Sequence, residues 1–196
     1  MSTQAQGPID FRTYYDLEPY LFDTVSKRFT TDHTLSAFDF FCIVIWKANR
    51  AKSKIARRLM EHGTYPDLDA AVRALVGDVA AASTPKDKLR VLFNDWGLLI
   101  PTASAILTVL YPSEFTVYDI RVCDELGDFH WVANISRYDR LWDAYEKYVA
   151  TVKRAAPDGL PLRDKDRWLW GKSFAEELRQ DVATVFTRTK KEPNRA

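Results

Sequence analysis

The sequence predicts an all-α protein, and three observations support this fold class. Apolar residues recur at spacings of three and four along most of the chain. Only seven glycines occur in 196 residues, and there is little of the alternation that marks a strand. Helix-capping sequences stand before several of the apolar stripes. The content of 46% hydrophobic and 28% charged residues is that of a globular chain and excludes wholesale disorder.

The first half of the chain predicts three helices in order. Asp16 is a cap signal for the first helix, which carries an apolar face of Leu21, Val25 and Phe29. Ser36-Ala-Phe-Asp39 is typical of a cap for a second helix, whose interior 38–46 is apolar nearly all round and is therefore expected in the core. The third helix has a stripe of Leu68, Val72, Leu75, Val76 and Val79.

Two helices joined by a short turn are predicted over residues of about 85–111. Thr84-Pro85-Lys86-Asp87 combines an N-cap, a first-turn proline and a third-position carboxylate. The helix that follows carries Leu89, Leu92, Phe93 and Trp96. Gly97 stands where a C-terminal glycine stops a helix, and Pro101 opens the next one. That helix ends at Pro112 and has as buried candidates Ala103, Ile106, Leu107 and Leu110.

Beyond this hairpin the pattern changes once and then returns to helices. Residues 115–119 are predicted to be extended. A later amphipathic helix carries Leu141, Tyr145, Tyr148 and Val152. Ser173-Phe-Ala-Glu176 is typical of a capping box for the last helix, with Leu178, Val182 and Phe186 on it. We expect residues 1–188 to form one two-lobed helical domain and residues 189–196 to be a frayed polar tail.

Composition excludes several functional classes. A net charge of +1, from 28 basic and 27 acidic residues, rules out a uniformly basic nucleic-acid wrapper but not a local basic patch. Cys42 and Cys123 are too few for a four-cysteine cluster, and the three histidines lack ligand spacing, so we expect no metal and no cofactor. The apolar run 40–46 is too short to span a membrane, and the N-terminus lacks the features of a secretory signal. We therefore expect a soluble, cytoplasmic monomer with no membrane partner.

Two segments are candidates for binding phosphate. A tight turn that feeds a helix start, as at 97–101, exposes unpaired backbone N–H groups that suit an anion. The alternative is an ordinary helical hairpin that packs in any α-fold. The segment 47–58 has no acid and contains Lys47, Arg50, Lys52, Lys54, Arg57 and Arg58. It is either a phosphate-facing patch or a solvated surface balanced by acids elsewhere.

Four segments in order resemble the helix-hairpin-helix DNA glycosylase superfamily, typified by endonuclease III. Gly97-Leu-Leu-Ile-Pro-Thr-Ala-Ser-Ala105 is similar to the hairpin L-P-G-V-G-x-x-T-A, and Val117-Tyr-Asp-Ile-Arg-Val122 to the downstream V-D-T-x-V. Ile45-Trp-Lys-Ala-Asn-Arg-Ala51 resembles L-L-S-A-Q-A-T, and Trp168-Leu-Trp-Gly-Lys172 resembles W-L-x-x-G-[RK]. The resemblance touches residues 36–175 and implies a two-lobed fold with a helix-hairpin-helix motif that binds double-stranded DNA.

The resemblance also assigns site residues. Asp119 falls on the catalytic aspartate, and Asn49 stands where the family has a glutamine that enters the DNA near the flipped base. The expected DNA-binding residues are Asn49, Arg50, Lys52, Lys54, Arg57, Gly97, Leu99, Pro101, Thr102 and Ala103. The expected base pocket consists of Trp46, Tyr118, Arg121, Trp168, Trp170 and Lys172. Since the chain has six tryptophans, core packing is the alternative for Trp168 and Trp170.

Three departures from the family pattern narrow the expected activity. Leu99 stands where the family has the second hairpin glycine, so the loop that would hold a phosphate is expected to bend differently from that of the family. Pro101 aligns with the lysine that bifunctional members use as a Schiff-base nucleophile, and proline cannot do that chemistry. The C-terminal four-cysteine cluster is absent from the sequence. The resemblance therefore implies a monofunctional glycosylase with neither lyase activity nor an iron–sulfur centre.

The expected function is excision of a damaged or modified base by hydrolysis of its N-glycosidic bond, in DNA repair or in defence against modified viral DNA. Asp119 would stabilise the sugar cation and activate water. Its alternative role is that of an N-cap, which any aspartate at a helix start can fill. The alternative functions are a helical DNA-binding module without excision activity and a helical protein-interaction domain.

Overall fold

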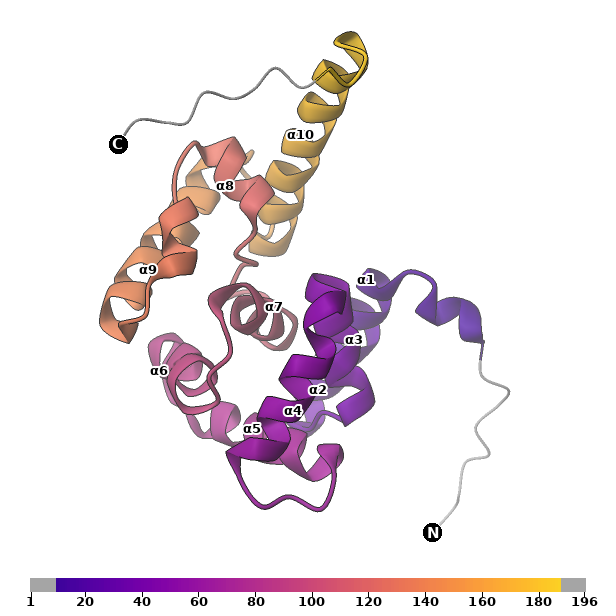
Figure 1. The fold of residues 1–196 in the computed structure, drawn as a ribbon, viewed down its shortest axis with the longest axis vertical. Helices are drawn as coiled ribbons and strands as arrows, with labels where there is room; N and C mark the ends of the chain where they lie inside the picture. The colour runs from indigo at the N-terminus through magenta and orange to yellow at the C-terminus, as the bar shows by residue number, and fades with distance from the viewer. Residues whose placement is uncertain (1–9, 188–196) are drawn as a thin grey trace. The chain divides into compact units, whose positions relative to one another are not determined.

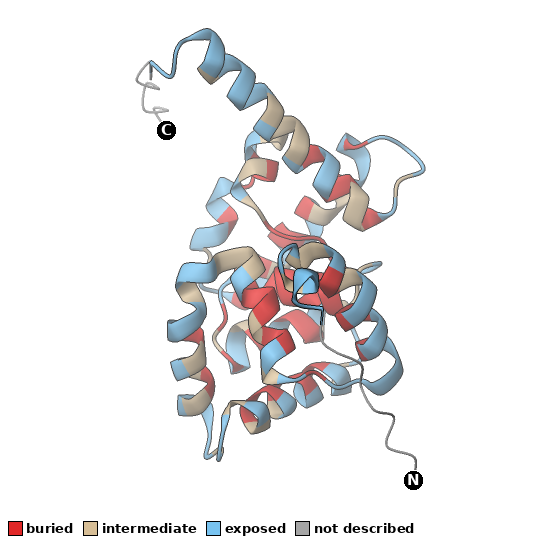
Figure 2. Ribbon diagram, turned by 90° about the vertical axis from the view of Figure 1, so that its right-hand side faces the viewer, coloured by how far each residue is buried: buried red, intermediate tan, exposed pale blue. Residues whose placement is uncertain are grey.

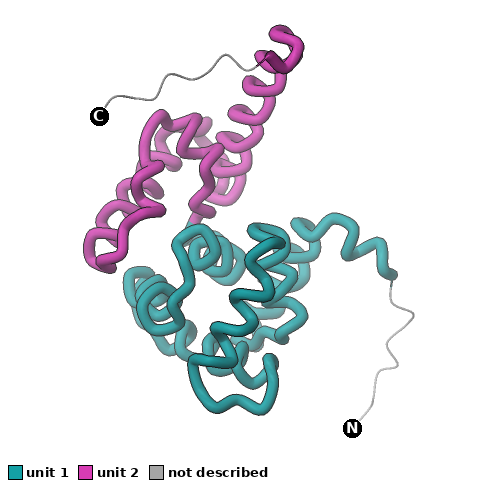
Figure 3. The backbone as a smooth tube through the Cα atoms, viewed as in Figure 1, with its two compact units in different colours: residues 1–115 teal, residues 116–196 magenta. Residues whose placement is uncertain are grey.

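The computed structural model describes residues 10–187 and confirms the all-α prediction. Every regular element in that part of the chain is a helix (Figure 1). The chain divides into two compact units, residues 1–115 and 116–196 (Figure 3). Among the described helices, none is both long enough and apolar enough to cross a membrane.

Unit 1 holds the elements of the predicted hairpin. Its α-helices are α1 Leu17–Pro19, α2 Ser26–Asp32, α3 Ala37–Ala48, α4 Lys52–His62, α5 Leu68–Ala81, α6 Pro85–Arg90 and α7 Ile100–Leu110. Wider π-helical turns occupy Tyr20–Val25 and Val91–Asp95, and 3-10 turns occupy Phe11–Tyr14 and Asn49–Ala51. The first helix therefore runs without a break from α1 to α2, and α6 continues through a π-turn to the hairpin turn.

The predicted caps of unit 1 are confirmed by their hydrogen bonds. The hydroxyl of Ser36 accepts the backbone N–H of Asp39 (3.1 Å), and the hydroxyl of Thr84 accepts that of Asp87 (3.1 Å). Asp16 caps α1 in the same way, through the N–H of Glu18 (3.2 Å). Each such cap stabilises a helix start by about 1 kcal/mol.

The core of unit 1 is built around α7. Ile100 and all residues from 102 to 110 are buried, as the predicted stripe required (Figure 2, buried residues in red). α7 packs against α2, α3 and α6, and a helix that is apolar on all sides belongs at such a centre. The same expectation for 38–46 is wrong in part. Phe38 and Ile45 are exposed because the face of α3 that carries them is only partly covered, and Phe38 contacts Tyr14 edge to face at the surface (5.3 Å between ring centroids).

A buried carboxylate joins the first helix to α3. Asp39 accepts hydrogen bonds from the Tyr20 hydroxyl (2.6 Å) and the Ser36 hydroxyl (2.6 Å) and forms an ion pair with Arg28. The side chain of Asp39 is nearly inaccessible, so these donors replace the water that it loses on folding. Removal of any one of them would leave a buried acceptor short of a partner.

The extended segment that the sequence predicts begins at the last residue of unit 1 and continues into unit 2. Residues 115–119 form no helix, and α8 Ile120–Leu126 follows directly. The remaining elements are the 3-10 turn His130–Asn134, α9 Tyr138–Ala155 and α10 Leu162–Ala183. The stripe predicted for α9 is confirmed, since every one of its members is buried: Leu141, Tyr145, Tyr148 and Val152. α10 packs against both α8 and α9.

The predicted start of the last helix is wrong. Ser173 lies in the middle of α10, which begins after Pro161. The first turns of α10 bury Leu162 and Leu169, so the helix is already formed before the Ser173 sequence is reached. A capping box has no role there, because the backbone N–H groups that it would serve lie inside the helix. The stripe predicted after it, Leu178, Val182 and Phe186, is exposed, and the predicted tail 189–196 lies outside the described residues.

Burial of acidic hydroxyl and thiol groups predicts a loss of stability at alkaline pH. Burial raises the pKa of Tyr20, Tyr145 and Tyr148 above the usual 10 and that of Cys42 from 9.0 to about 11. The unfolded chain therefore releases these protons first as the pH rises. The stabilisation of the folded state by these protonated buried groups is fully present below about pH 9 and is lost progressively as the pH rises above it. We expect the melting temperature to be flat from pH 7 to about 8.5 and to fall steeply by about pH 11.

A pair of conservative variants separates this cause from general alkaline damage. Tyr20→Phe removes one buried phenol and should reduce the fall in melting temperature between pH 8 and pH 11. Tyr15 is 95% exposed, so Tyr15→Phe should leave the profile unchanged. Equal profiles for both variants and the parent protein would show that Tyr20 does not contribute.

Candidate functional site

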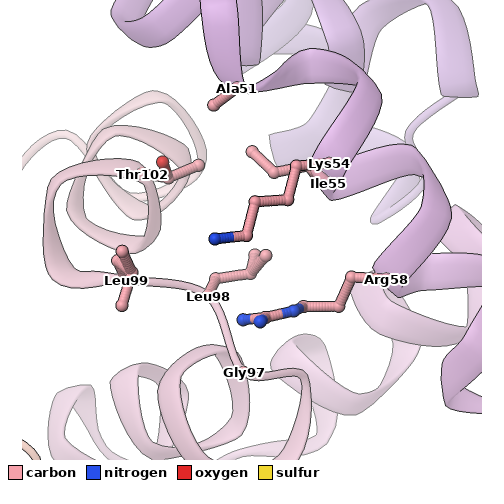
Figure 4. A pocket seen from close by; sticks show the side chains of 8 residues that line it. All are labelled: Ala51, Lys54, Ile55, Arg58, Gly97, Leu98, Leu99 and Thr102. Carbon is pink, nitrogen blue, oxygen red and sulfur yellow. The ribbon is translucent and has the colours of Figure 1, made fainter.

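Unit 1 brings the predicted turn and the basic segment together around one hollow. The hollow has a volume of about 100 Å³ and is open to solvent (Figure 4). Its lining comes from α4, from the residue before α4, and from the hairpin turn with the start of α7: Ala51, Lys54, Ile55, Arg58, Gly97, Leu98, Leu99 and Thr102. Lys54 and Arg58 stand one helical turn apart on the same face of α4, and both extend toward the turn (Figure 4).

Gly97 gives the turn its shape and makes room for a cation. Its φ of +63° lies in the left-handed region, where a side chain is strained. The Leu98 N–H then donates back to the carbonyl of Leu92 (2.8 Å), which closes the preceding helix. A Cβ at Gly97 would lie 3.1 Å from Nη1 of Arg58, so the absence of a side chain also lets the guanidinium approach. The predicted helix stop at Gly97 is confirmed.

The start of α7 lies beside the hollow, which Leu99 and Thr102 help to line. The N–H groups of Thr102 and Ala103 both donate to the carbonyl of Leu99 (3.0 and 2.9 Å), and Pro101 has no N–H. No side chain caps α7, and the N–H groups of Leu99 and Ile100 find no acceptor within residues 10–187. Donors of this kind at the positive end of a helix favour an anion.

Leu99, which departs from the family hairpin, fits this turn without strain. Its backbone is extended (φ −69°, ψ 153°), a conformation that any residue adopts. The side chain is 61% exposed at the rim of the hollow. The replacement of glycine at this position therefore does not prevent the turn from forming.

The other predicted DNA-binding residues of unit 1 lie outside the hollow. Arg50 is exposed in a 3-10 turn, and beside it the side-chain oxygen of Asn49 accepts a hydrogen bond from Lys52 (2.7 Å). Arg57 pairs with Glu61 (3.7 Å) on the exposed side of α4, and Ala103 is fully buried within α7.

Sequence reasoning placed Arg58 in the basic segment but not among the binding residues. Its spacing of four from Lys54 is the signal that could have found it.

In unit 2, Asp119 is the N-cap of α8. Its Oδ1 accepts the backbone N–H of Arg121 (3.0 Å), and the residue is half-buried. The geometry of the cap is thus the one that an aspartate at a helix start ordinarily takes. The positive end of α8 also stabilises negative charge at this carboxylate.

Arg121 connects this cap to a pair of exposed aromatic rings on α10. Its guanidinium carbon lies 5.4 Å from the ring centroid of Trp170 and 5.5 Å from that of Phe174, and it forms an ion pair with Glu177. The two rings are stacked (5.6 Å between centroids, 14° between planes), and each is about two-fifths exposed. One residue therefore binds the Asp119 carboxylate through its backbone and covers the aromatic pair with its side chain.

Phe174 was not among the predicted site residues. It lies four positions after Trp170 on the same helix face, and this spacing was available in the sequence.

The remaining residues of the predicted base pocket have separate surroundings. Lys172 binds Glu125 and lies 5.8 Å from the ring centroid of Trp168, and its hydrogen bond with Glu125 raises its pKa. Tyr118 is buried, and its hydroxyl donates to the carbonyl of Phe129 (2.8 Å). Trp46 belongs to unit 1, where it is half-buried and meets Phe22 edge to face (5.9 Å).

Comparison of the chain with protein-family models, with curated proteins and with solved structures gives no match. The described residues contain no group of three or more His, Cys, Asp or Glu side chains that could hold a metal ion. Two groups of described residues are candidate sites. Unit 1 has a cationic hollow beside the start of α7, and unit 2 has a carboxylate connected to an aromatic pair.

The local geometry at two glycines predicts opposite effects on stability when each is replaced by alanine. Gly97→Ala forces a side chain into the left-handed region and against Arg58, so it should lower the free energy of unfolding by about 1–2 kcal/mol. Gly77 lies inside α5 with nothing within 4 Å of an added Cβ. Gly77→Ala should raise the free energy of unfolding by about 0.5–1 kcal/mol. Urea unfolding of both variants measures the difference, and a neutral Gly97→Ala would contradict the assigned turn geometry.

Proposed function

We propose that the chain is a DNA-binding protein of the helix-hairpin-helix type and that it acts as a monofunctional DNA glycosylase. The observation that carries the proposal is the hollow of unit 1, where Lys54 and Arg58 face the turn that precedes α7. Two flexible cations and the N–H group of Leu99, which has no acceptor within residues 10–187, are donors that suit a phosphate group. The paired helices and tight turn of residues 85–110 support the resemblance to the family hairpin.

DNA is the proposed partner because the binding groups suit a backbone rather than a single small anion. The hollow is open and the exposed Leu99 forms part of its rim, so a phosphate there can remain part of a larger chain. Arg50, exposed in the turn before α4, offers a further cation. Asn49, exposed in the same 3-10 turn, is the proposed residue for the gap left by a flipped nucleotide.

Asp119 is the proposed catalytic carboxylate. In the reaction, the N-glycosidic bond breaks and its electron pair leaves with the base, while the oxygen of a water molecule bonds to the sugar carbon. The carboxylate stabilises the sugar cation and takes a proton from the water. The aromatic pair Trp170 and Phe174 offers a stacking surface for an extruded base.

The proposed product is an intact strand with an abasic site. Pro101 has no amine to form a Schiff base, and Lys172 is held in its protonated form by Glu125. A strand break should therefore appear only after alkali is added. Repair of damaged DNA and defence against modified viral DNA are both roles for such an enzyme.

A second candidate function, a helical DNA-binding module without excision activity, is supported by the capping role of Asp119. The Asp119 carboxylate caps α8, which is a structural use that a protein without excision activity would also need. In that case the chain is a helical DNA-binding module, and the hollow of unit 1 is its main binding surface.

Binding through the hollow predicts a specific salt dependence. Lys54→Ala and Arg58→Ala should each weaken duplex binding and lower the slope of log K against log salt by about one unit or less. Lys27→Ala is the matched control, because Lys27 is an exposed cation of unit 1 that pairs with Asp23 (3.5 Å) outside the hollow. Fluorescence anisotropy from 50 to 300 mM salt measures the slopes. Equal slopes for all three variants would remove the hollow from DNA binding.

The role of Asp119 predicts a separation of excision from folding. Asp119→Asn keeps the size and much of the capping capacity but removes the negative charge. Single-turnover excision should fall by about 10² to 10⁴, while melting temperature and duplex affinity stay close to those of the parent protein. The substrates are duplexes with alkylated adenine, uracil, oxidised guanine, mispaired thymine or an enlarged cytosine, cleaved with alkali after incubation.

Each other outcome of this assay has a distinct meaning. Full excision by a well-folded Asp119→Asn variant removes Asp119 from the mechanism. A large fall in melting temperature shows that the cap is its main role. Tight duplex binding with no excision by the parent protein on any of these bases supports the DNA-binding module instead.

A further inference from the structure

The extended segment before Asp119 is held by side chains instead of a neighbouring strand. The hydroxyl of Tyr145 accepts the N–H of Thr116 (3.2 Å) and donates to the carbonyl of the same residue (2.7 Å). The hydroxyl of Tyr148 donates to the carbonyl of Val117 (2.9 Å). Both tyrosines lie on α9, one turn apart, and both are fully buried.

A buried carboxylate from α10 completes the set. Oδ2 of Asp166 accepts the N–H of Val117 (3.2 Å) and the hydroxyl of Thr116 (2.9 Å). Its other oxygen pairs with Arg163, so the charge that burial would penalise is compensated within unit 2. Both backbone groups of Thr116 and both of Val117 thus have a partner from these three side chains.

The two tyrosine hydroxyls keep the same hydrogen-bonding roles over a wide pH range. Burial raises the pKa of Tyr145 and Tyr148, so both phenols remain O–H donors well into alkaline pH. Buried polar groups cost free energy that apolar side chains of similar size would not. Unlike apolar side chains, these three groups fix the backbone conformation of residues 116–117 through hydrogen bonds.

We propose that Tyr145, Tyr148 and Asp166 are positioning residues that fix the 116–117 backbone and so hold the Asp119 carboxylate in its reactive orientation. The inference rests on the proposed glycosylase function. Asp119 stands two residues after Val117, which leaves few torsions between the held backbone and the carboxylate. The N-cap hydrogen bond to Arg121 fixes the other side. A displacement of about 1 Å at a reacting group can cost about 100-fold in rate, so loosening this backbone should reduce catalysis.

Lys165, next to Asp166 on α10, supplies a matched control. It is buried to a similar degree, and its ammonium donates to the carbonyls of Lys153 (2.8 Å), Pro157 (3.0 Å) and Ala156 (3.3 Å) at the end of α9. These bonds stabilise the α9–α10 connection without touching the segment before Asp119. Lys165→Met should therefore destabilise unit 2 without moving the carboxylate.

The test compares Tyr145→Phe and Tyr148→Phe with Lys165→Met in the full-length protein. Each Tyr→Phe change removes one oxygen and keeps the packing, which makes it milder than a change at Asp166, since that change would also break the ion pair with Arg163. The measurements are melting temperature, duplex affinity and the single-turnover excision rate on whichever of the five modified duplexes the parent protein cleaves. We expect the two Tyr→Phe variants to lose about 10- to 100-fold in excision rate with duplex affinity within about twofold. Lys165→Met should keep the excision rate of the parent protein, even if its melting temperature falls as much as that of the Tyr→Phe variants.

The possible results separate this inference from the function on which it rests. A rate loss confined to the tyrosine variants supports the positioning role. Parent-level excision by both tyrosine variants, or an equal rate loss in Lys165→Met, overturns the positioning role and leaves the glycosylase function standing. If the parent protein excises none of the five bases, the proposed function fails, and the positioning role fails with it.

Discussion

A backbone N–H or C=O that leaves water on folding must find a hydrogen-bond partner, and this constraint bears on both candidate sites of the chain. Within the helices the backbone groups bond to one another, so the need for partners falls on the connections between the helices. Two short connections differ in how far they satisfy it. Around residues 116–117 buried side chains supply every partner, whereas at the start of α7 two N–H groups have none among the described residues.

This difference fits the use that we propose for each connection. A catalytic carboxylate gains from a backbone with one conformation, and that requires partners that are themselves fixed by packing, as Tyr145 and Tyr148 are in α9. A phosphate site gains from donors that are not yet used. The left-handed Gly97 and the extended Leu99 turn the chain so that α7 begins without a side-chain cap, beside Lys54 and Arg58.

Features set by neighbouring residues could be predicted from the sequence. The caps at Ser36 and Thr84, the stop at Gly97 and the stripes of α7 and α9 depend on spacings within one or two helical turns. The cap predicted at Ser173 is wrong. The capping sequence there is a local signal, and burial of residues earlier in α10 starts the helix before it. The three side chains that hold residues 116–117 could not be predicted, since they lie 29 to 50 positions away and an aromatic stripe gives no sign of where its hydroxyls point.

The cap at Asp119 and the proposed catalysis are compatible for an electrostatic reason. Asp39 and Asp166, the buried carboxylates of the two units, each form an ion pair with an arginine. Arg121 acts differently: it binds Asp119 through its backbone N–H, while its guanidinium pairs with Glu177 and covers the aromatic pair on α10. A carboxylate has four lone-pair sites, and this N–H takes one of them. The backbone of Arg121 thus orients Asp119, and an oriented, ionised carboxylate is the group that a developing sugar cation requires.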